Sequence, residues 1–339
     1  MALTRNLFVF LLLLSPVLPT VAANPGKARK TEPSTAGPLG GHHPILWLNP
    51  ADIGSRNLFL GPGGQKHQPQ QGMFSFLKED LNGTNPKFDV KDSADVKWKV
   101  KMGAEARPET AASRLIWAAG YFADDDYFLD SLHVEDLPAH LKRGQKLVHN
   151  GTVVNVRLKR ENAKKFGTWA WKEYPFTGTR ELNGLRLMMA LINNWDVKDE
   201  NNAIYEADNG DRVYLVSDLG ASFGTAGADW PLTKSKGNLK SYAHSKFLTR
   251  VTPEFVEFKE PARPALIWLV HPGDFFRRLD LEWIGKQIPR ADAKWMGGLL
   301  SQLSSTQIHD AFRAAGYTPQ QADGFAAVVE KRIAALKAL

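Results

Sequence analysis

The spacing of apolar residues changes midway along the chain. From Met73 to Met102, apolar and polar side chains tend to alternate, as they do in β-strands that bury one face. From Glu181 onward, apolar residues recur every three or four positions, as they do in helices that bury one face. A chain with strands gathered in its first half and helices in its second half is expected to fold as an α+β protein. We therefore expect a small sheet-rich lobe followed by a larger helical lobe.

The sheet-rich half is predicted to begin with a hairpin, whose turn lies at residues 82–86, and to continue into a third strand. Pro108 and Glu109 open a helical stretch over residues 110–119, and Gly120 ends it. The alternating pattern predicts strands at residues 74–76, 88–90 and 96–102, and residues 127–129 and 153–158 resemble two more strands.

The second half is predicted to begin with a helix over residues 181–193. Its buried face carries four apolar side chains: Leu182, Leu185, Met189 and Ile192. A second hairpin is predicted around Asn209-Gly210. The chain from residue 242 to its end is largely helical by pattern, with helix starts near Ser304 and Thr318.

The first 23 residues are typical of an export signal. Arg5 precedes a short apolar run, and small side chains lead up to Ala23, after which we expect cleavage. The run is shorter than the roughly 20 residues that a membrane span needs, and no later segment is long and apolar enough. We therefore expect a secreted or periplasmic protein without a membrane span. Residues 24–72, rich in Pro, Gly, Lys and Gln, are predicted to form a linker or a loosely packed arm.

Composition excludes several kinds of chemistry. The chain has no cysteine, which rules out disulfides, thiolate metal sites and cysteine nucleophiles, so a metal site must use Asp, Glu, Asn or His. The 43 Lys and Arg residues exceed the 36 Asp and Glu residues by a modest margin. That excess suits phosphates or acidic surfaces and is not by itself a nucleic-acid signature. We expect a monomer with no nucleic-acid partner.

One constellation of polar residues points to phosphoryl transfer. Asp196 and Asn201 stand in the loop after the helix at 181–193, and Asp218 follows the hairpin. Phosphoryl transfer needs a carboxylate to orient or deprotonate the acceptor hydroxyl, an amide oxygen to bind Mg²⁺, and a second carboxylate to bridge the metal and the phosphates. The three residues supply these groups in that order.

The sheet-rich half offers a cation for the phosphates. Lys99 and Lys101, with Lys97, fall on one face of the strand at 96–102. Glu105 and Glu109 stand just before and at the start of the next helix. We prefer Lys101 with Glu109 as the ion pair of the site, and Lys99 and Glu105 remain alternatives.

These motifs resemble a known superfamily. Asn194-Trp195-Asp196 with Asn201, followed by Asp218-Leu219-Gly220, is similar to the catalytic loop and the Asp-Phe-Gly segment of protein kinase-like proteins. The likeness is to the atypical branch, which includes HipA-like, CotH-like and phosphatidylinositol kinase-like proteins, and it covers about residues 73–225. It implies a bilobal protein kinase-like fold with an N-lobe at 73–160 and a C-lobe at 161–339.

The resemblance also implies a phosphotransferase that uses ATP with Mg²⁺ or Mn²⁺. Asp196 would act on the acceptor, and Asn201 and Asp218 would bind the metal. A lysine, Lys101 or Lys99, would hold the phosphates and pair with Glu109 or Glu105. The acceptor, a protein, lipid or sugar, stays open.

Other interpretations of these residues remain open. The chain could be a catalytically inactive binding or scaffold protein on the same fold. It could also be a glycan hydrolase that uses Asp196 and Asp218 as paired carboxylates. Asp196 and Asn201 could also merely cap a helix and a turn. The three acids at 124–126 are expected to form a solvated loop, with a cation site as the alternative.

Overall fold

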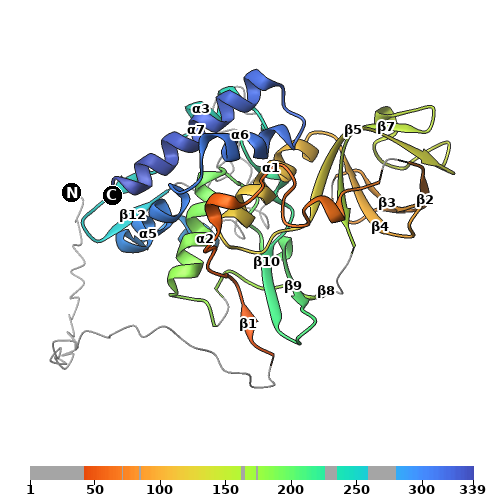
Figure 1. The fold of residues 1–339 in the computed structure, drawn as a ribbon. Coiled ribbons are helices and arrows are strands. Elements are labelled where there is room, and N and C mark those ends of the chain that lie inside the picture. Colours follow the sequence, from red (N-terminus) through yellow and green to blue (C-terminus); the bar gives the residue numbers. More distant parts are fainter. Residues whose placement is uncertain are drawn as a thin grey trace, which may run out of the picture. The chain divides into compact units, whose positions relative to one another are not determined.

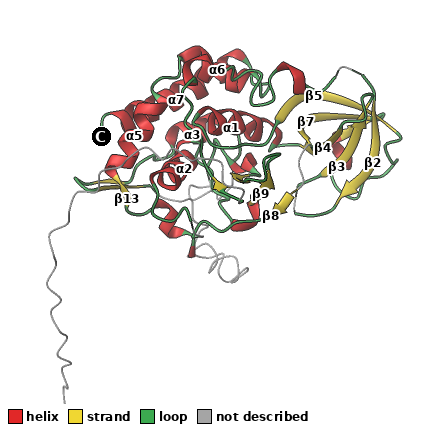
Figure 2. Cartoon of the chain, turned by 60° about the horizontal axis from the view of Figure 1, so that its bottom comes forward, coloured by secondary structure: helices red, strands yellow, loops and turns green. Residues whose placement is uncertain are grey.

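The computed structural model describes residues 42–70, 72–83, 85–161, 165–172, 175–225, 235–258 and 280–339. All of them belong to one unit, Gly41–Leu339. The expected export signal lies outside the described residues. Within the unit, the strands of a six-stranded sheet lie to one side and the helices lie together on the other (Figures 1 and 2). The chain is therefore an α+β protein.

The six-stranded sheet closes on itself. Its strand order is β4-β3-β2-β5-β7-β6, and β4 also pairs with β7, so the sheet curls round a core of its own. The alternation in the sequence produces this core, because every second side chain points inward. The strands are β2 (Phe74–Asp80), β3 (Lys87–Asp92), β4 (Lys97–Met102), β5 (Asp126–Glu135), β6 (Val148–His149) and β7 (Thr152–Arg160). The predicted hairpin and third strand are confirmed.

Helix α1 (Ala106–Ala118) connects the sheet to the helices. It contacts β5 and β7, and its Ala111, Leu115 and Ile116 lie in the main hydrophobic core. The helix begins four residues before the predicted start, at Ala106 instead of Thr110. Pro108 fits there because the first turn of a helix does not use its backbone N–H groups for internal hydrogen bonds.

The other helices enclose the main core (Figure 2). They are α2 (Arg180–Leu191), α3 (Leu239–His244), α5 (Arg290–Leu300), α6 (Ser305–Arg313) and α7 (Pro319–Lys337). Ser304 and Thr318 each form a capping box, which confirms the two predicted helix starts. Among the described residues, no helix combines the length and the hydrophobicity needed to cross a membrane.

A small sheet positions the loops of the second half. Its order is β1-β10-β9-β8, and the β9–β10 pair is the predicted second hairpin. The bounds are β1 (Pro44–Ile45), β8 (Lys165–Gly167), β9 (Asn202–Glu206) and β10 (Arg212–Val216). Three further short strands pair beside α5: β11 (Arg250–Val251), β12 (Phe255–Glu257) and β13 (Ile288–Pro289).

Residues 42–70 pack more closely than the sequence predicts. Leu46, Ile53 and Leu58 are buried in the main core, and β1 pairs with β10. The side chain of Gln307 donates hydrogen bonds to the backbone carbonyls of Ile53 and Arg56. The expectation of a linker or loosely packed arm is therefore corrected for these residues. Their apolar side chains are too irregularly spaced to reveal an element, yet Leu46, Ile53 and Leu58 each fill a place in the core.

Candidate active site

A cavity of about 580 Å³ lies where β4, α1 and the loops after α2 and β10 meet. Every site residue that the sequence predicts lines it, together with several cations that the sequence analysis did not select. The predicted residues are Lys99, Lys101, Glu105, Glu109, Asp196, Asn201 and Asp218. Residues that are more than 100 positions apart in the sequence thus share one space.

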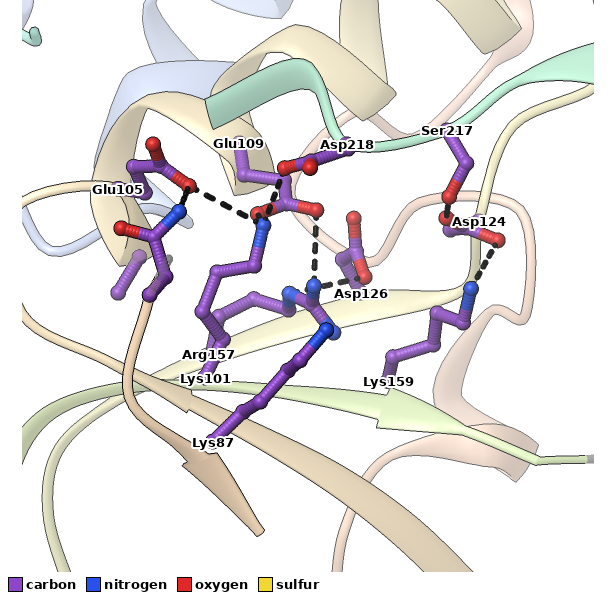
Figure 3. Close-up of polar contacts among 12 residues, drawn as sticks. Lys87, Lys101, Glu105, Glu109, Asp124, Asp126, Arg157, Lys159, Ser217 and Asp218 are labelled. Atoms are coloured by element: carbon purple, nitrogen blue, oxygen red, sulfur yellow. Dashed lines mark hydrogen bonds and ion pairs between the residues drawn. The ribbon is translucent and has the colours of Figure 1, made fainter. Parts of the chain in front are cut away.

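Lys101 lies at the centre of the acidic side chains (Figure 3). Its Nζ atom is 2.6 Å from Glu109, 2.5 Å from Asp218 and 3.2 Å from Glu105. Burial alone would lower the pKa of this amine, but the surrounding carboxylates, Glu109 foremost, raise it above its ordinary value. Lys101 is therefore a fixed positive charge.

Glu109 is held between two cations. Its other carboxylate oxygen accepts a hydrogen bond of 2.8 Å from Arg157 on β7, which also lies 3.4 Å from Asp126. Burial raises the pKa of Glu109, and Arg157 and Lys101 act in the opposite direction. Since a buried charge persists only when it is paired, the three side chains depend on one another.

The structure distinguishes the two candidate lysines. Lys99 forms ion pairs with two other acids, and its Nζ atom is 3.0 Å from Asp80 and 3.1 Å from Asp89. Lys101, two residues on, contacts Glu109 and Asp218 instead. Both side chains leave the same face of β4, so the positions of the acids, and not the strand pattern, decide which lysine pairs with α1.

Glu105 is a second carboxylate that contacts Lys101. It accepts hydrogen bonds from Lys101, from Asn85 at 2.5 Å, and from Lys236. The ammonium of Lys236 also lies over the Trp195 ring, 5.5 Å from its centre. Glu105 therefore joins the turn between β2 and β3, the strand β4 and the segment after residue 235.

The loop after α2 is held by its own hydrogen bonds. The side chain of Asn194 accepts a 2.8 Å bond from the Asp196 N–H, and the side-chain amide of Asn201 donates a 2.6 Å bond to the Asp196 carbonyl. Lys198 Nζ lies 2.9 Å from the Asp196 carboxylate. The Asp-x4-Asn spacing thus brings Asp196 and Asn201 together as parts of one turn.

Asp218 adopts a left-handed backbone conformation, with φ +55° and ψ +49°. Such a conformation is uncommon for a residue other than glycine, and asparagine and aspartate tolerate it best. Burial raises the pKa of Asp218, but Lys101 beside it more than compensates and holds the pKa below its ordinary value. Asp218 is therefore an anion at neutral pH.

The donors in the cavity suit a hard divalent cation. Oxygens of Glu105, Glu109 and Asp218 lie within 4.8 Å of one another. Asn201 uses its amide nitrogen as a donor, so its amide oxygen is the atom that can serve as a ligand. Carboxylate and amide oxygens are the ligands that Mg²⁺ and Mn²⁺ prefer. Glu109 and Glu105 each contact a second cation, Arg157 and Lys236 respectively, whereas the Asp218 side chain is 41% exposed to the cavity, so Asp218 and Asn201 fit the role of metal ligands best.

The acids at 124–126 do not form the solvated loop that the sequence predicts. Asp124 contacts Lys159 at 3.0 Å and accepts a hydrogen bond from Ser217, and Asp126 is fully buried beside Arg157. Asp125 lies 2.9 Å from His67. Asp124 and Asp126 are buried because each faces a basic or hydroxyl side chain that is distant in sequence (Figure 3).

A second cavity, of about 740 Å³, adjoins the first and shares Lys87, Lys99, Lys159 and Ser217 with it. Part of its wall is apolar, formed by Phe122, Ala203, Val213 and Leu215. The two cavities together combine an apolar space with a charged one.

Sequence reasoning missed several cations of the site. Arg157 and Lys159 carried a detectable signal, because they are basic residues at alternate positions of an otherwise apolar strand. Lys198 stands two residues after Asp196 and could have been included on proximity alone. Nothing in the local sequence marks Lys236, because its partner Glu105 is 131 residues away.

Comparisons with known proteins add one structure. No protein-family model matches the chain. The comparison with curated proteins finds no match either. A search of solved structures finds the crystal structure of a proinflammatory kinase of Helicobacter pylori, CtkA, with a TM-score of 0.39 and 9% sequence identity. The alignment covers 78% of this chain and 96% of that one.

Proposed function

We propose that this chain is a kinase-like phosphotransferase that binds ATP with Mg²⁺ or Mn²⁺ in the two adjoining cavities. The observation that carries the proposal is the contact of Lys101 with both Glu109 and Asp218, in a cavity that Asp196 and Asn201 also line. A buried cation between a helix acid and a loop acid is the arrangement that positions nucleotide phosphates in kinases.

The order of the parts along the chain supports the same proposal. Lys101 is on a strand of the curled sheet, and its partner Glu109 is on the helix that follows. Asp196 and Asn201 come after a buried helix. Asp218 follows a hairpin. A bilobal protein kinase-like fold, with the six-stranded sheet and α1 as its N-lobe, accounts for this order.

The charge of the cavity favours a polyanionic ligand. Among the described residues that line the cavity around Lys101, seven are lysine or arginine and four are aspartate or glutamate. These ammonium and guanidinium groups can contact phosphates, and the nearby apolar wall of the second cavity suits a base. A neutral glycan would not use so many cationic groups, so the hydrolase alternative is less well supported.

The residues would divide the chemistry as follows. Asp218 and Asn201 would hold the metal, which neutralises charge on the phosphates. Lys101 would orient the phosphates, and Asp196 would accept the proton of the acceptor hydroxyl as its oxygen bonds to the transferred phosphorus and the bond to the ADP oxygen breaks. Lys198, 2.9 Å from Asp196, would place a positive charge near the transferred group.

The remaining parts of the proposal rest on the sequence alone. The leader at residues 1–23 supports export and a secreted or periplasmic location. The acceptor, a protein, lipid or sugar, is not part of the proposal.

Nucleotide binding to the purified chain without its leader tests the proposal. We expect ATP to raise the unfolding temperature in the presence of Mg²⁺ or Mn²⁺, and to do so much less with EDTA. Loss of the γ-phosphate of labelled ATP would then reveal turnover. A chain that binds ATP without any transfer would be an inactive kinase-fold binding protein, and a chain that binds no nucleotide would contradict the proposal.

A further inference from the structure

Three cations lie side by side across the curled sheet. Lys87 on β3 is directly opposite Lys101 on β4, and Lys101 is directly opposite Arg157 on β7. Residues that face each other across strands project from the same face of a sheet, and like charges in that position repel. Figure 3 shows the three side chains converging on the same region. A row of this kind needs negative charge close to each member.

Two members of the row have that charge. Lys101 is within 3.2 Å of three carboxylates, and Arg157 is within 3.4 Å of two. Lys87 differs from both. Its closest carboxylate among the described residues is Asp80, at 3.6 Å, and Asp80 already accepts hydrogen bonds of 3.0 Å from Lys99 and 2.9 Å from the Asn82 N–H.

Lys87 also has little water to compensate for its long contact with Asp80. Its side chain is 21% exposed, and it lines both cavities. A Cβ atom at Gly83 would lie 3.9 Å from the Lys87 Nζ atom, so the ammonium stands beside the turn that joins β2 and β3. Burial lowers the pKa of this amine. Lys101 and Lys99 lower it further, whereas Asp80 raises it. A nearby anion would reverse that effect.

The backbone next to Lys87 cannot donate to a phosphate. The residue before Lys87 is Pro86, which has no N–H group to donate. A charged side chain at the base of the turn can supply a stronger hydrogen bond than a backbone amide. Its position, two strands from Arg157 and one from Lys101, extends the line of positive charge toward the turn.

We infer that Lys87 is a polyphosphate-binding residue, whose ammonium contacts the phosphate chain of the bound nucleotide from beneath the β2–β3 turn. The inference rests on the proposed function and adds a second side-chain cation to Lys101. The ligand it selects is a nucleoside di- or triphosphate in preference to a nucleoside.

The test compares ligands with and without phosphates on matched variants. Affinities for ATP, ADP and adenosine, each with Mg²⁺, are measured by calorimetry for the wild type, Lys87→Met and Lys91→Met. Lys91 is a suitable control because it lies on the same strand, pairs with Asp95 at 2.7 Å and lines neither cavity. We expect Lys87→Met to weaken ATP and ADP binding about tenfold or more, the scale of a hydrogen bond to a charged group, and to leave adenosine binding unchanged. Lys87→Arg should restore much of the loss.

Each other outcome is decisive. Equal ATP affinity in wild type and Lys87→Met would overturn the inference and leave the proposed function intact, as would an equal loss for ATP and adenosine, which indicates a structural role. If the wild type binds no nucleotide, the proposed function fails, and inorganic tripolyphosphate becomes the probe. Binding of tripolyphosphate that depends on Lys87 would preserve the inference, and no binding would overturn it. The unfolding temperature of Lys87→Met should be at or above that of the wild type, because the substitution removes repulsion.

Discussion

The ammonium of Lys101 lies 2.6 Å from the carboxylate of Glu109, although one residue is on strand β4 and the other on helix α1. Both side chains are almost fully buried, at 6% and 1% exposure. The contact therefore ties the curled sheet to the helix that enters the main core, and it also orients the cation toward Asp218. Stability and ligand binding should both depend on it.

Removing one partner of this pair should be far more harmful than removing both. Lys101→Met leaves Glu105 and Glu109 buried without their shared cation, and we expect a loss of about 3–5 kcal/mol in the free energy of unfolding. In the double variant Lys101→Met with Glu109→Gln, much of that loss should be recovered, because the most deeply buried carboxylate is neutral, Glu105 keeps its contact with Lys236 and Arg157 keeps its contact with Asp126. Urea unfolding of the single and double variants measures this difference, and equal costs would show that the charges do not interact.

Asp218→Ala should abolish metal-dependent nucleotide binding and leave the fold intact. The side chain is 41% exposed and faces the cavity, so its removal takes little from the core. Thermal shift with ATP and Mg²⁺ measures the binding, and the far-ultraviolet circular dichroism spectrum verifies the fold. An unchanged ATP affinity in the variant would assign Asp218 a structural role only.

The Asp196→Asn variant should lose phosphoryl transfer but keep its affinity for ATP. The amide has nearly the same shape, but it cannot accept the proton of an acceptor hydroxyl, so we expect the transfer rate to fall about 100-fold or more. The control is Asp208→Asn, an exposed acid in the β9–β10 turn, which should behave as wild type. A rate that stays within a few-fold of wild type would remove Asp196 from the reaction.

Gly220→Ala should destabilise the site by steric overlap. A Cβ atom at residue 220 would lie 2.6 Å from the Cβ of Glu105, so α1 or the loop after Asp218 would have to move. We expect a loss of about 1–3 kcal/mol in unfolding free energy, together with weaker ATP binding. The matched control is Gly298→Ala on α5, where nothing lies within 4 Å and alanine should be neutral or stabilising. Equal stability of the two variants would contradict the close approach.

The stability contribution of Asp218 should disappear in acid. Burial raises its pKa, but Lys101 outweighs that effect and the net pKa lies below the ordinary value of about 4. A carboxyl group with a lowered pKa stabilises the folded state above its unfolded pKa and loses that effect as the pH falls through its folded pKa. The difference in unfolding free energy between wild type and Asp218→Asn should therefore shrink between about pH 5 and pH 2. A difference that stays constant over this range would show that the carboxylate is not stabilised by Lys101.

Local patterns in the sequence were enough for much of this fold. Alternation predicted β2, β3 and β4 of the curled sheet, helical spacing predicted α2, and the capping residues Ser304 and Thr318 marked the starts of α6 and α7. The order of Lys101, Glu109, Asp196, Asn201 and Asp218 along the chain is enough to identify the candidate site. Such signals are readable because they depend on residues within a few positions of one another.

Only the tertiary structure decided between equivalent candidates. Strand alternation puts Lys99 and Lys101 on the same face, and it took the positions of Asp80 and Asp89 to separate them. The same is true of the acids at 124–126, whose burial depends on partners such as Lys159 and Arg157 on another strand. A charge is stable in the interior only beside an opposite charge, and the sequence does not record which distant residue that will be. The ion-pair network of the site is therefore a product of the fold, and the row of Lys87, Lys101 and Arg157 became visible only when three strands were placed in register.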